Sequence, residues 1–234
     1  MTTEAPESEA RSTGDVIRRF GGRYSVELGI DLSASDTGAV FKWFLAALLF
    51  GARISEKLAA RTYRAFARED LLSPQRIQER GWDGLVAVLD AGGYARYDFK
   101  TATKLLDVCG NLLERYGGDL VRLHSMATSP EDLEERIRSL GKGIGAVTLG
   151  IFLRELRGVW INAQPPLAEP VLEAAKALGF LSTEYSDPGK SLEHLLRIWS
   201  REGHAAKDFP DFESALVRAG LALRRQKQFS RDVG

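Results

Sequence analysis

The sequence predicts an all-α protein, and three observations lead to that class. From Asp36 onwards the apolar residues recur at helical spacing, without the sustained apolar–polar alternation that indicates strands. Helix boundaries are well marked, since "TSPEDLEERI" places a Ser129 cap before Pro130, and "RYGG" and "ALGF" end helices with glycine. The stretch "FKWFLAALLFG" is apolar on nearly all sides, which is typical of a helix buried at the centre of an α-domain.

These signals define a series of helices along the chain. The first holds the apolar run, the fourth ends at "RYGG", the fifth starts after Ser129, the seventh starts beside Pro170, and the last two are amphipathic. The predicted helices span about 36–50, 55–69, 81–91, 98–116, 130–140, 145–157, 169–179, 188–202 and 208–226.

Composition limits the classes of site that the chain can hold. Its 234 residues, 44% hydrophobic and 27% charged, are enough to bury a substantial core. Because 32 basic and 32 acidic side chains balance, no global field attracts nucleic acid, and any anion site must be local. A single cysteine, Cys109, excludes an internal disulfide, a four-cysteine iron-sulfur cluster and a zinc ribbon. The three histidines lack metal-ligand spacing, so we expect no cofactor and no metal.

The chain carries no targeting or membrane signal. Residues 1–14 are polar and acidic without an apolar stretch, so we expect a disordered tail there and a single folded unit over 15–234. The longest apolar run, "AVFKWFLAALLFGA", contains Lys42 and is too short to span a bilayer. The sequence therefore predicts a cytoplasmic protein without a membrane partner.

The stretch "SLGKGIGAVTLGIF", residues 139–152, places three glycines between two helices. The first N–H groups of the second helix lack intrahelical partners and carry the positive end of its dipole. Gly143 and Gly145 would let an oxyanion approach these amides, Ile144 would pin the turn to the core, and Lys142 would add charge. The turn is thus predicted to bind a phosphate of DNA, which positions a protein on a duplex regardless of base sequence.

A simple helix–helix connection with glycine caps would give the same pattern. The basic residues around the turn favour the anion site, because they form a local patch in a neutral chain, and Arg154 is the further DNA contact we expect among them. They are Arg136, Arg138, Lys142, Arg154 and Arg157.

Residues from about 38 to 180 resemble the helix-hairpin-helix DNA glycosylases, the superfamily of endonuclease III. The family hairpin, commonly L-P-G-V-G followed by x-K-T-A, is matched by "GKGIG" and then "AVTL". Upstream, "FLAALLFGARISEKLAA" and "LDAGGYARYDFKTATKLLDVCGNLLERYGG" are similar to an early buried helix and to the long helix before the hairpin. Downstream, "PPLAEPVLEAAKALGF" resembles V-D-T-H-V-x-R-V-x-x-R-L-G-L.

The resemblance implies an all-α, two-lobed fold that binds double-stranded DNA in a cleft between its lobes. Lobe one would span about 36–140, and lobe two would combine 15–35 with 141–234. A damaged or modified nucleotide would be flipped into a pocket, where its N-glycosidic bond is cut. Arg53 lies close to the family's intercalating loop residue and would help to fill the gap left by the flipped base. The alternative is that Arg53 is only an exposed charge.

Two family residues are replaced in this chain. Val147 stands where bifunctional members carry the lysine that forms a Schiff base, so lyase chemistry through this position is excluded. Ala168 stands where the family has its catalytic aspartate. Glu169, the next residue, is our first candidate for the missing charge and Asn162 is the second, although Glu169 is equally explained as an acid favouring a helix start.

These replacements suggest a monofunctional glycosylase. Since Val147 and Ala168 are small, the pocket would admit a bulky or hypermodified base, for example in foreign DNA. Residues 181–234 contain no cysteine, so the family's iron-sulfur cluster is not expected. Two alternatives stay open: the same fold binding distorted or modified DNA without cleavage, and an all-α interaction domain with a coincidental hairpin.

Overall fold

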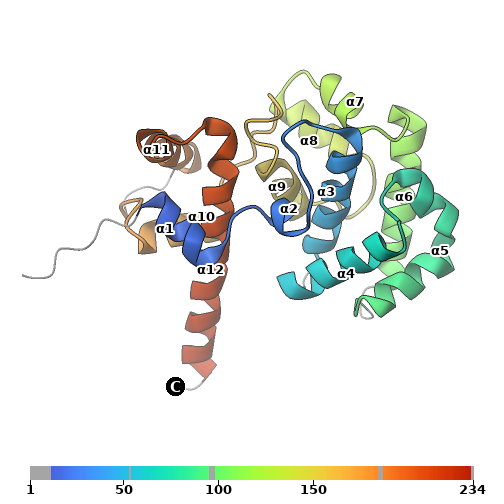
Figure 1. Cartoon of the computed structure of the whole chain (residues 1–234), viewed down its shortest axis with the longest axis horizontal. Helices are drawn as coiled ribbons and strands as arrows, with labels where there is room; N and C mark the ends of the chain where they lie inside the picture. The colour runs from blue at the N-terminus through green and yellow to red at the C-terminus, as the bar shows by residue number, and fades with distance from the viewer. Residues whose placement is uncertain (1–11, 53, 95–97, 184–186, 233–234) are drawn as a thin grey trace, which may run out of the picture. The chain divides into compact units, whose positions relative to one another are not determined.

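The computed structural model describes residues 12–52, 54–94, 98–183 and 187–232, and in these residues the regular structure is helical, without a strand (Figure 1). This confirms the all-α class. The helices are α1 (Thr13–Phe20), α2 (Tyr24–Glu27), α3 (Thr37–Phe50), α4 (Glu56–Arg68), α5 (Pro74–Ala91), α6 (Asp98–Tyr116), α7 (Leu120–Ser125), α8 (Pro130–Arg138), α9 (Ala146–Arg154), α10 (Glu169–Ala177), α11 (Pro188–Arg201), the 3₁₀ helix η1 (Ala206–Asp208) and α12 (Phe209–Asp232).

Each of the predicted helices is present, and the differences lie at helix ends and in short segments. Helix α5 begins earlier than predicted, because Ser73 caps it and Pro74 occupies its first turn. It continues through a kink at Gly81, whose φ of 69° lies in the left-handed region that glycine tolerates. Helix α1 starts inside the expected tail, at a capping box formed by Ser12 and Asp15. Helices α1, α2 and α7 were not predicted.

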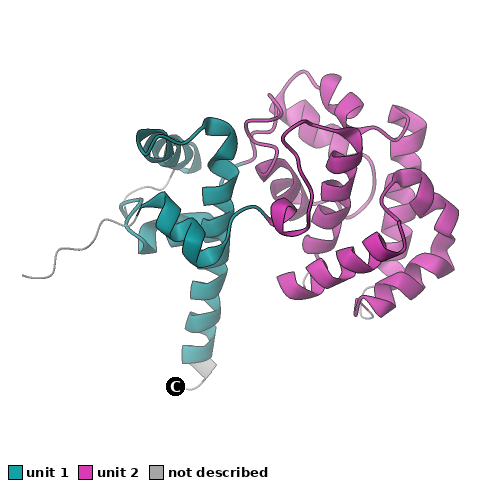
Figure 2. Cartoon of the chain, viewed as in Figure 1, with its two compact units in different colours: residues 1–23, 166–234 teal, residues 24–165 magenta. Residues whose placement is uncertain are grey.

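The chain forms two compact units (Figure 2). Unit 1 comprises Met1–Arg23 and Pro166–Gly234, and unit 2 comprises Tyr24–Pro165. The N-terminal segment up to Arg23 belongs to the same unit as the C-terminal helices. The predicted boundaries, at 35 and 140, had placed the hairpin and its second helix in the same lobe as the C-terminal helices. In the structure the hairpin and this helix lie in unit 2.

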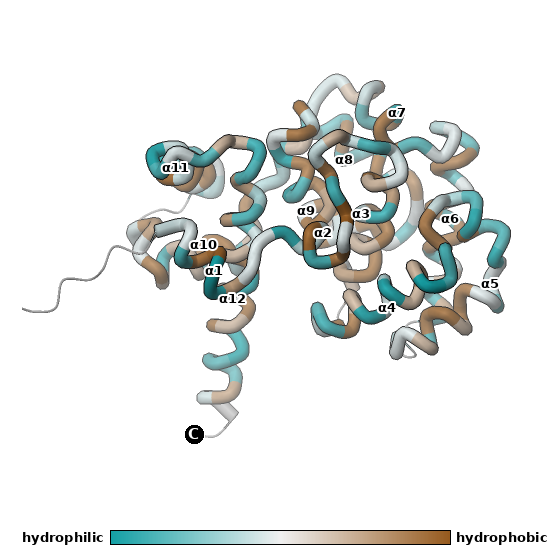
Figure 3. Tube along the Cα trace, in the orientation of Figure 1, coloured by the Kyte–Doolittle hydropathy of each residue, from teal (hydrophilic) through white to brown (hydrophobic). Residues whose placement is uncertain are grey.

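Unit 2 is built around α3, whose residues from Val40 to Leu49 are buried except Lys42. Helices α4, α7 and α9 pack against α3, while α5 and α6 pack against each other. Apolar residues run along α3 and α9 (Figure 3). The Trp43 indole N–H donates to the carbonyl of Phe152 at 3.0 Å, which ties α9 to the central helix. This contact explains why the hairpin belongs to unit 2.

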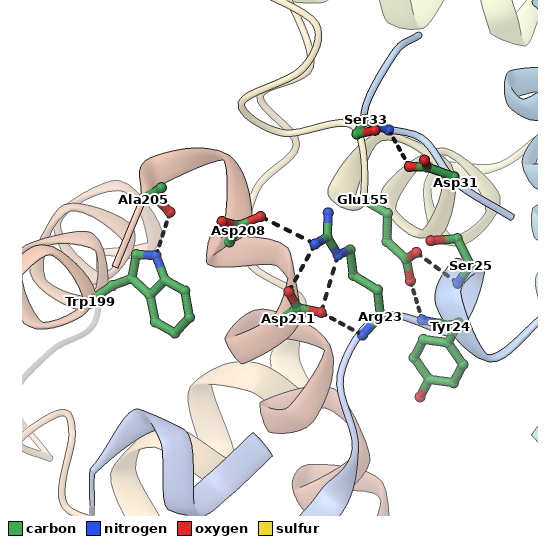
Figure 4. A network of polar contacts seen from close by, with 10 residues as sticks. All are labelled: Arg23, Tyr24, Ser25, Asp31, Ser33, Glu155, Trp199, Ala205, Asp208 and Asp211. Carbon is green, nitrogen blue, oxygen red and sulfur yellow. Dashed lines mark hydrogen bonds and ion pairs between the residues drawn. The ribbon is translucent and has the colours of Figure 1, made fainter. Parts of the chain in front are cut away.

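A buried carboxylate holds the start of unit 2. Glu155 accepts hydrogen bonds from the backbone N–H groups of Tyr24 at 2.8 Å and Ser25 at 2.9 Å (Figure 4). Burial raises the pKa of Glu155, although these two donors oppose that shift. The carboxylate thereby satisfies the first amides of α2, which would otherwise lack partners.

Unit 1 has its own core, formed by α1, α10, α11 and α12 around Trp199, Phe209 and Phe212. Arg23 closes this unit, since its side chain pairs with Asp211 at 3.0 Å and with Asp208 at 3.3 Å (Figure 4). Within the described residues, no helix combines the length and apolar character needed to cross a membrane.

Candidate nucleic-acid interface

The predicted hairpin is present as the turn between α8 and α9. Gly143 has a φ of +84°, a left-handed conformation that favours glycine. The side chain of Ile144 is 3% exposed and belongs to the core of unit 2, whereas Lys142, Gly143 and Gly145 are exposed. The turn is therefore fixed by one apolar side chain while its backbone faces solvent.

Helix α9 begins without a side-chain cap. Its N-cap residue is Gly145, which has no side chain to accept a hydrogen bond from the first turn. Among the described residues, the N–H groups from Gly145 to Thr148 have no acceptor. Four successive donors at the positive end of a helix dipole are suited to an anion such as phosphate.

One face of α6 holds carbonyl groups of the hairpin. Lys104 Nζ donates to the carbonyl of Gly143 at 3.0 Å, Asn111 Nδ2 to that of Leu140 at 2.9 Å, and Arg115 Nη1 to that of Ser139 at 3.1 Å. Residues spaced by seven and four lie on one stripe of a helix. The carbonyls at the end of α8 and in the turn thus have protein partners, and the amides that follow them do not.

The first turn of α9 meets the C-terminal end of α3. A Cβ built on Gly51, the residue that ends α3, would stand 2.1 Å from Thr148 Oγ1. The Tyr94 hydroxyl donates to the carbonyl of Leu49 at 3.3 Å, so the segment after α5 reaches the same end of α3. Val147, which takes the place of the family lysine, is 66% exposed beside this junction. Arg53 lies outside the described residues.

The predicted basic patch is wrong in most of its members. Arg136 pairs with Asp132 on its own helix at 2.9 Å. Arg138 lies 3.6 Å from Glu134, which neutralises part of its charge. Arg154, in α9, and Arg157, after it, are buried. Of the five basic residues, which all lie in the described part of the chain, only Lys142 is therefore both exposed and outside the ion pairs given above.

Arg154 is corrected from an exposed DNA contact to a buried residue. It is 5% exposed, and its guanidinium lies over the Tyr24 ring, 5.5 Å from the centroid. Arg157 is also buried and donates to the carbonyl of Pro165 at 2.6 Å. Both side chains are therefore buried within unit 2, Arg154 at the end of α9 and Arg157 in the segment that follows it.

The first catalytic candidate is an exposed carboxylate in unit 1. Glu169 is the first residue of α10, and its side chain is 85% exposed. Arg224 of α12 donates to Glu169 at 3.1 Å and to both oxygens of Glu173 at 2.9 Å. Ala168 is the N-cap of the same helix and is exposed. A carboxylate is therefore present at 169, with a cation as its neighbour.

Asn162, the second candidate, lies in unit 2 in the segment after α9. Its Nδ2 donates to the carbonyl of Ala127 at 3.0 Å, so one side of its amide supports the loop before α8. The structure gathers Lys142, Gly143, Ile144, Gly145 and Val147 in one turn of unit 2. Glu169 and Ala168 lie together in unit 1.

The sequence interpretation missed the three side chains of α6 that donate to hairpin carbonyls. A signal was available in the sequence, because Lys104, Asn111 and Arg115 are spaced as neighbours on one face of a helix that precedes the hairpin.

Among the described residues, no group of three histidine, cysteine, aspartate or glutamate side chains is placed to hold a metal ion. A scan against models of known families and a search of curated proteins both found no match for the chain.

Proposed function

We propose that this chain is a monofunctional DNA glycosylase of the helix-hairpin-helix class. The observation that carries the proposal is the run of N–H groups from Gly145 to Thr148 at the start of α9, which have no acceptors in the described chain. A DNA phosphate would accept from these amides, and the nearby Lys142 would add attraction that salt weakens. The motifs quoted above supply the link to base excision.

The proposed reaction is hydrolysis without a covalent enzyme intermediate. A water oxygen bonds to C1′ of the flipped nucleotide, the N-glycosidic bond breaks, and the base leaves with a proton. Val147 has no amine, so no Schiff base forms at this position. Of the two candidates, Glu169 is proposed to stabilise the positive charge that develops on the sugar. Because Val147 stands where bifunctional members of the family carry the bulkier lysine, a bulky modified base is the substrate that we propose.

A second candidate function is recognition of modified or distorted DNA without cleavage. It is favoured by the ion pair between Glu169 and Arg224, because a nearby cation offsets the charge that a leaving base would need. The hairpin would bind DNA in the same way under both functions. The two therefore differ only in whether a base is released.

The test combines binding and product assays on duplexes that carry damaged, mismatched or hypermodified bases. We expect base release by the wild type and at least a roughly hundred-fold slower release by Glu169→Gln, as when a preorganised charge is lost. Glu173→Gln is the matched control, since Glu173 shares Arg224 as its partner. Binding without release across the panel would support the second function, and no binding at low salt would exclude both.

A further inference from the structure

Lys104 is the residue of α6 that reaches the outer part of the hairpin. Its Nζ donates to the carbonyl of Gly143 at 3.0 Å, and a Cβ built on Gly143 would stand 3.7 Å from Lys104 Cδ and 3.9 Å from Cε. The side chain therefore runs along the turn before its ammonium meets the carbonyl. Asn111 and Arg115 act further back, at the end of α8.

This contact restrains a glycine of the turn that has a left-handed conformation. Gly143 has a φ of +84°, and glycine exchanges between such conformations more readily than other residues. Because the peptide group is planar, fixing the Gly143 carbonyl also fixes the plane of the peptide that leads to Ile144. The amides that start at Gly145 thus follow directly after two fixed groups, the tethered Gly143 carbonyl and the buried Ile144 side chain.

The same contact places a cation at the turn. An ammonium has three donors, and the Gly143 carbonyl uses one of them. Burial lowers the pKa of the Lys104 amine, because the charged form has lost part of its hydration. An anion close to such a partly desolvated charge is attracted more strongly than an anion beside a fully solvated lysine.

We infer that Lys104 is a positioning residue of the hairpin and that its ammonium is the second positive charge, with Lys142, that the bound phosphate meets. This inference rests on the proposed DNA binding. The positive charge at the turn is thus assigned to two lysines, Lys142 in the turn and Lys104 on α6, and not to the predicted arginines. The arginines, by contrast, are paired or buried.

The test is the salt dependence of double-stranded DNA binding by the full chain. Lys104→Met keeps the apolar stem and removes the charge, so we expect weaker binding at low salt and a slope of log K against log salt that is smaller by about 0.9. Arg115→Met is the matched control, because it removes one charge and one hairpin contact from the same helix. Its slope should equal that of the wild type. Lys104→Arg should restore the wild-type slope.

The outcomes separate the inference from the function on which it rests. A wild type that binds DNA, with Lys104→Met folded and unchanged in slope and affinity, would overturn the inference and leave the proposed function standing. Weaker binding at an unchanged slope would also overturn it, since that result indicates a structural role alone. A wild type that shows no affinity for DNA at low salt would remove the proposed function itself. Urea unfolding establishes that each variant is folded.

Discussion

Gly51 and Thr148 join the end of the central helix to the start of the hairpin helix. A Cβ on Gly51 would stand 2.1 Å from Thr148 Oγ1 and 3.1 Å from Thr148 Cβ, closer than packed atoms approach. The first turn of α9, whose first amides have no acceptor among the described residues, is therefore braced against α3. The position of those amides depends on a residue without a side chain.

Gly51→Ala should destabilise unit 2 by about 1 to 3 kcal/mol, as overpacking of a core does. Gly51 has a φ of −71°, so alanine fits its backbone and the cost is steric. Urea unfolding measures the loss, and DNA affinity should fall with it because the first turn of α9 must move. Thr148→Ala removes Oγ1, so the double variant should lose less stability than the two single variants together. If the losses of unfolding free energy were strictly additive, the clash at Gly51→Ala would not involve Thr148.

Two glycines inside helices should respond to alanine in opposite directions. Alanine favours a helix over glycine by about 1 kcal/mol. At Gly220 a Cβ would stand 2.1 Å from the carbonyl oxygen of Pro170, which is backbone and cannot rotate away. Gly220→Ala should therefore destabilise unit 1 by about 1 to 3 kcal/mol despite that preference.

Gly150 is the contrasting position, because a Cβ there meets no atom within 4 Å. Gly150→Ala should stabilise α9 by about 0.5 to 1 kcal/mol. Calorimetric unfolding of the two variants beside the wild type measures both changes. A stabilised Gly220→Ala protein would mean that α10 and α12 pack less closely than the structure shows.

His124 should make the protein less stable in mild acid. Its ring stacks on Trp160 with centroids 4.4 Å apart, its Nε2 is buried without an acceptor in the described residues, and burial lowers its pKa. The unfolded chain then binds more protons than the folded one, so this contribution is complete above the ordinary pKa of about 6.5 and is lost as pH falls below it. Unfolding free energies at several pH values for the wild type and His124→Phe should show a smaller decline in the variant. Equal declines would assign the acid sensitivity to other groups.

Cys109 should not react with thiol reagents in the folded protein. Burial raises the pKa of its thiol to about 12, so at pH 8 roughly one molecule in ten thousand carries the thiolate that reacts. Labelling should follow unfolding, with one thiol modified in denaturant. Rapid labelling in buffer would show that the contact between α6 and its neighbours opens readily.

The hairpin was predictable because its signals are local. A proline and a serine cap begin α8, glycines form the turn, and Ile144 is the apolar residue within the turn. The central position of α3 likewise follows from an apolar run that no surface helix carries. Helix boundaries followed from the same signals.

The burial of Arg154 was not predictable from the sequence, because it depends on distant partners. Arg154 lies over the ring of Tyr24, and the neighbouring Glu155 binds the amide of Tyr24, which is 131 residues away in the chain. The same contacts bring α2 into unit 2 and shift the boundary between the units. Nothing in the spacing around the hairpin indicates such pairings, whereas the regular spacing of Lys104, Asn111 and Arg115 did contain a usable signal.

DNA affinity of Gly145→Asp at low salt tests the central claim most directly. Aspartate is a preferred N-cap, and nothing lies within 4 Å of a Cβ at Gly145, so the variant should be as stable as the wild type or slightly more stable. Its carboxylate would occupy the free amides and repel phosphate, whereas Gly145→Asn caps the helix without that charge. We predict that Gly145→Asp remains folded and loses at least about ten-fold in affinity, more than Gly145→Asn. Wild-type affinity in a folded Gly145→Asp protein would contradict DNA binding by the hairpin.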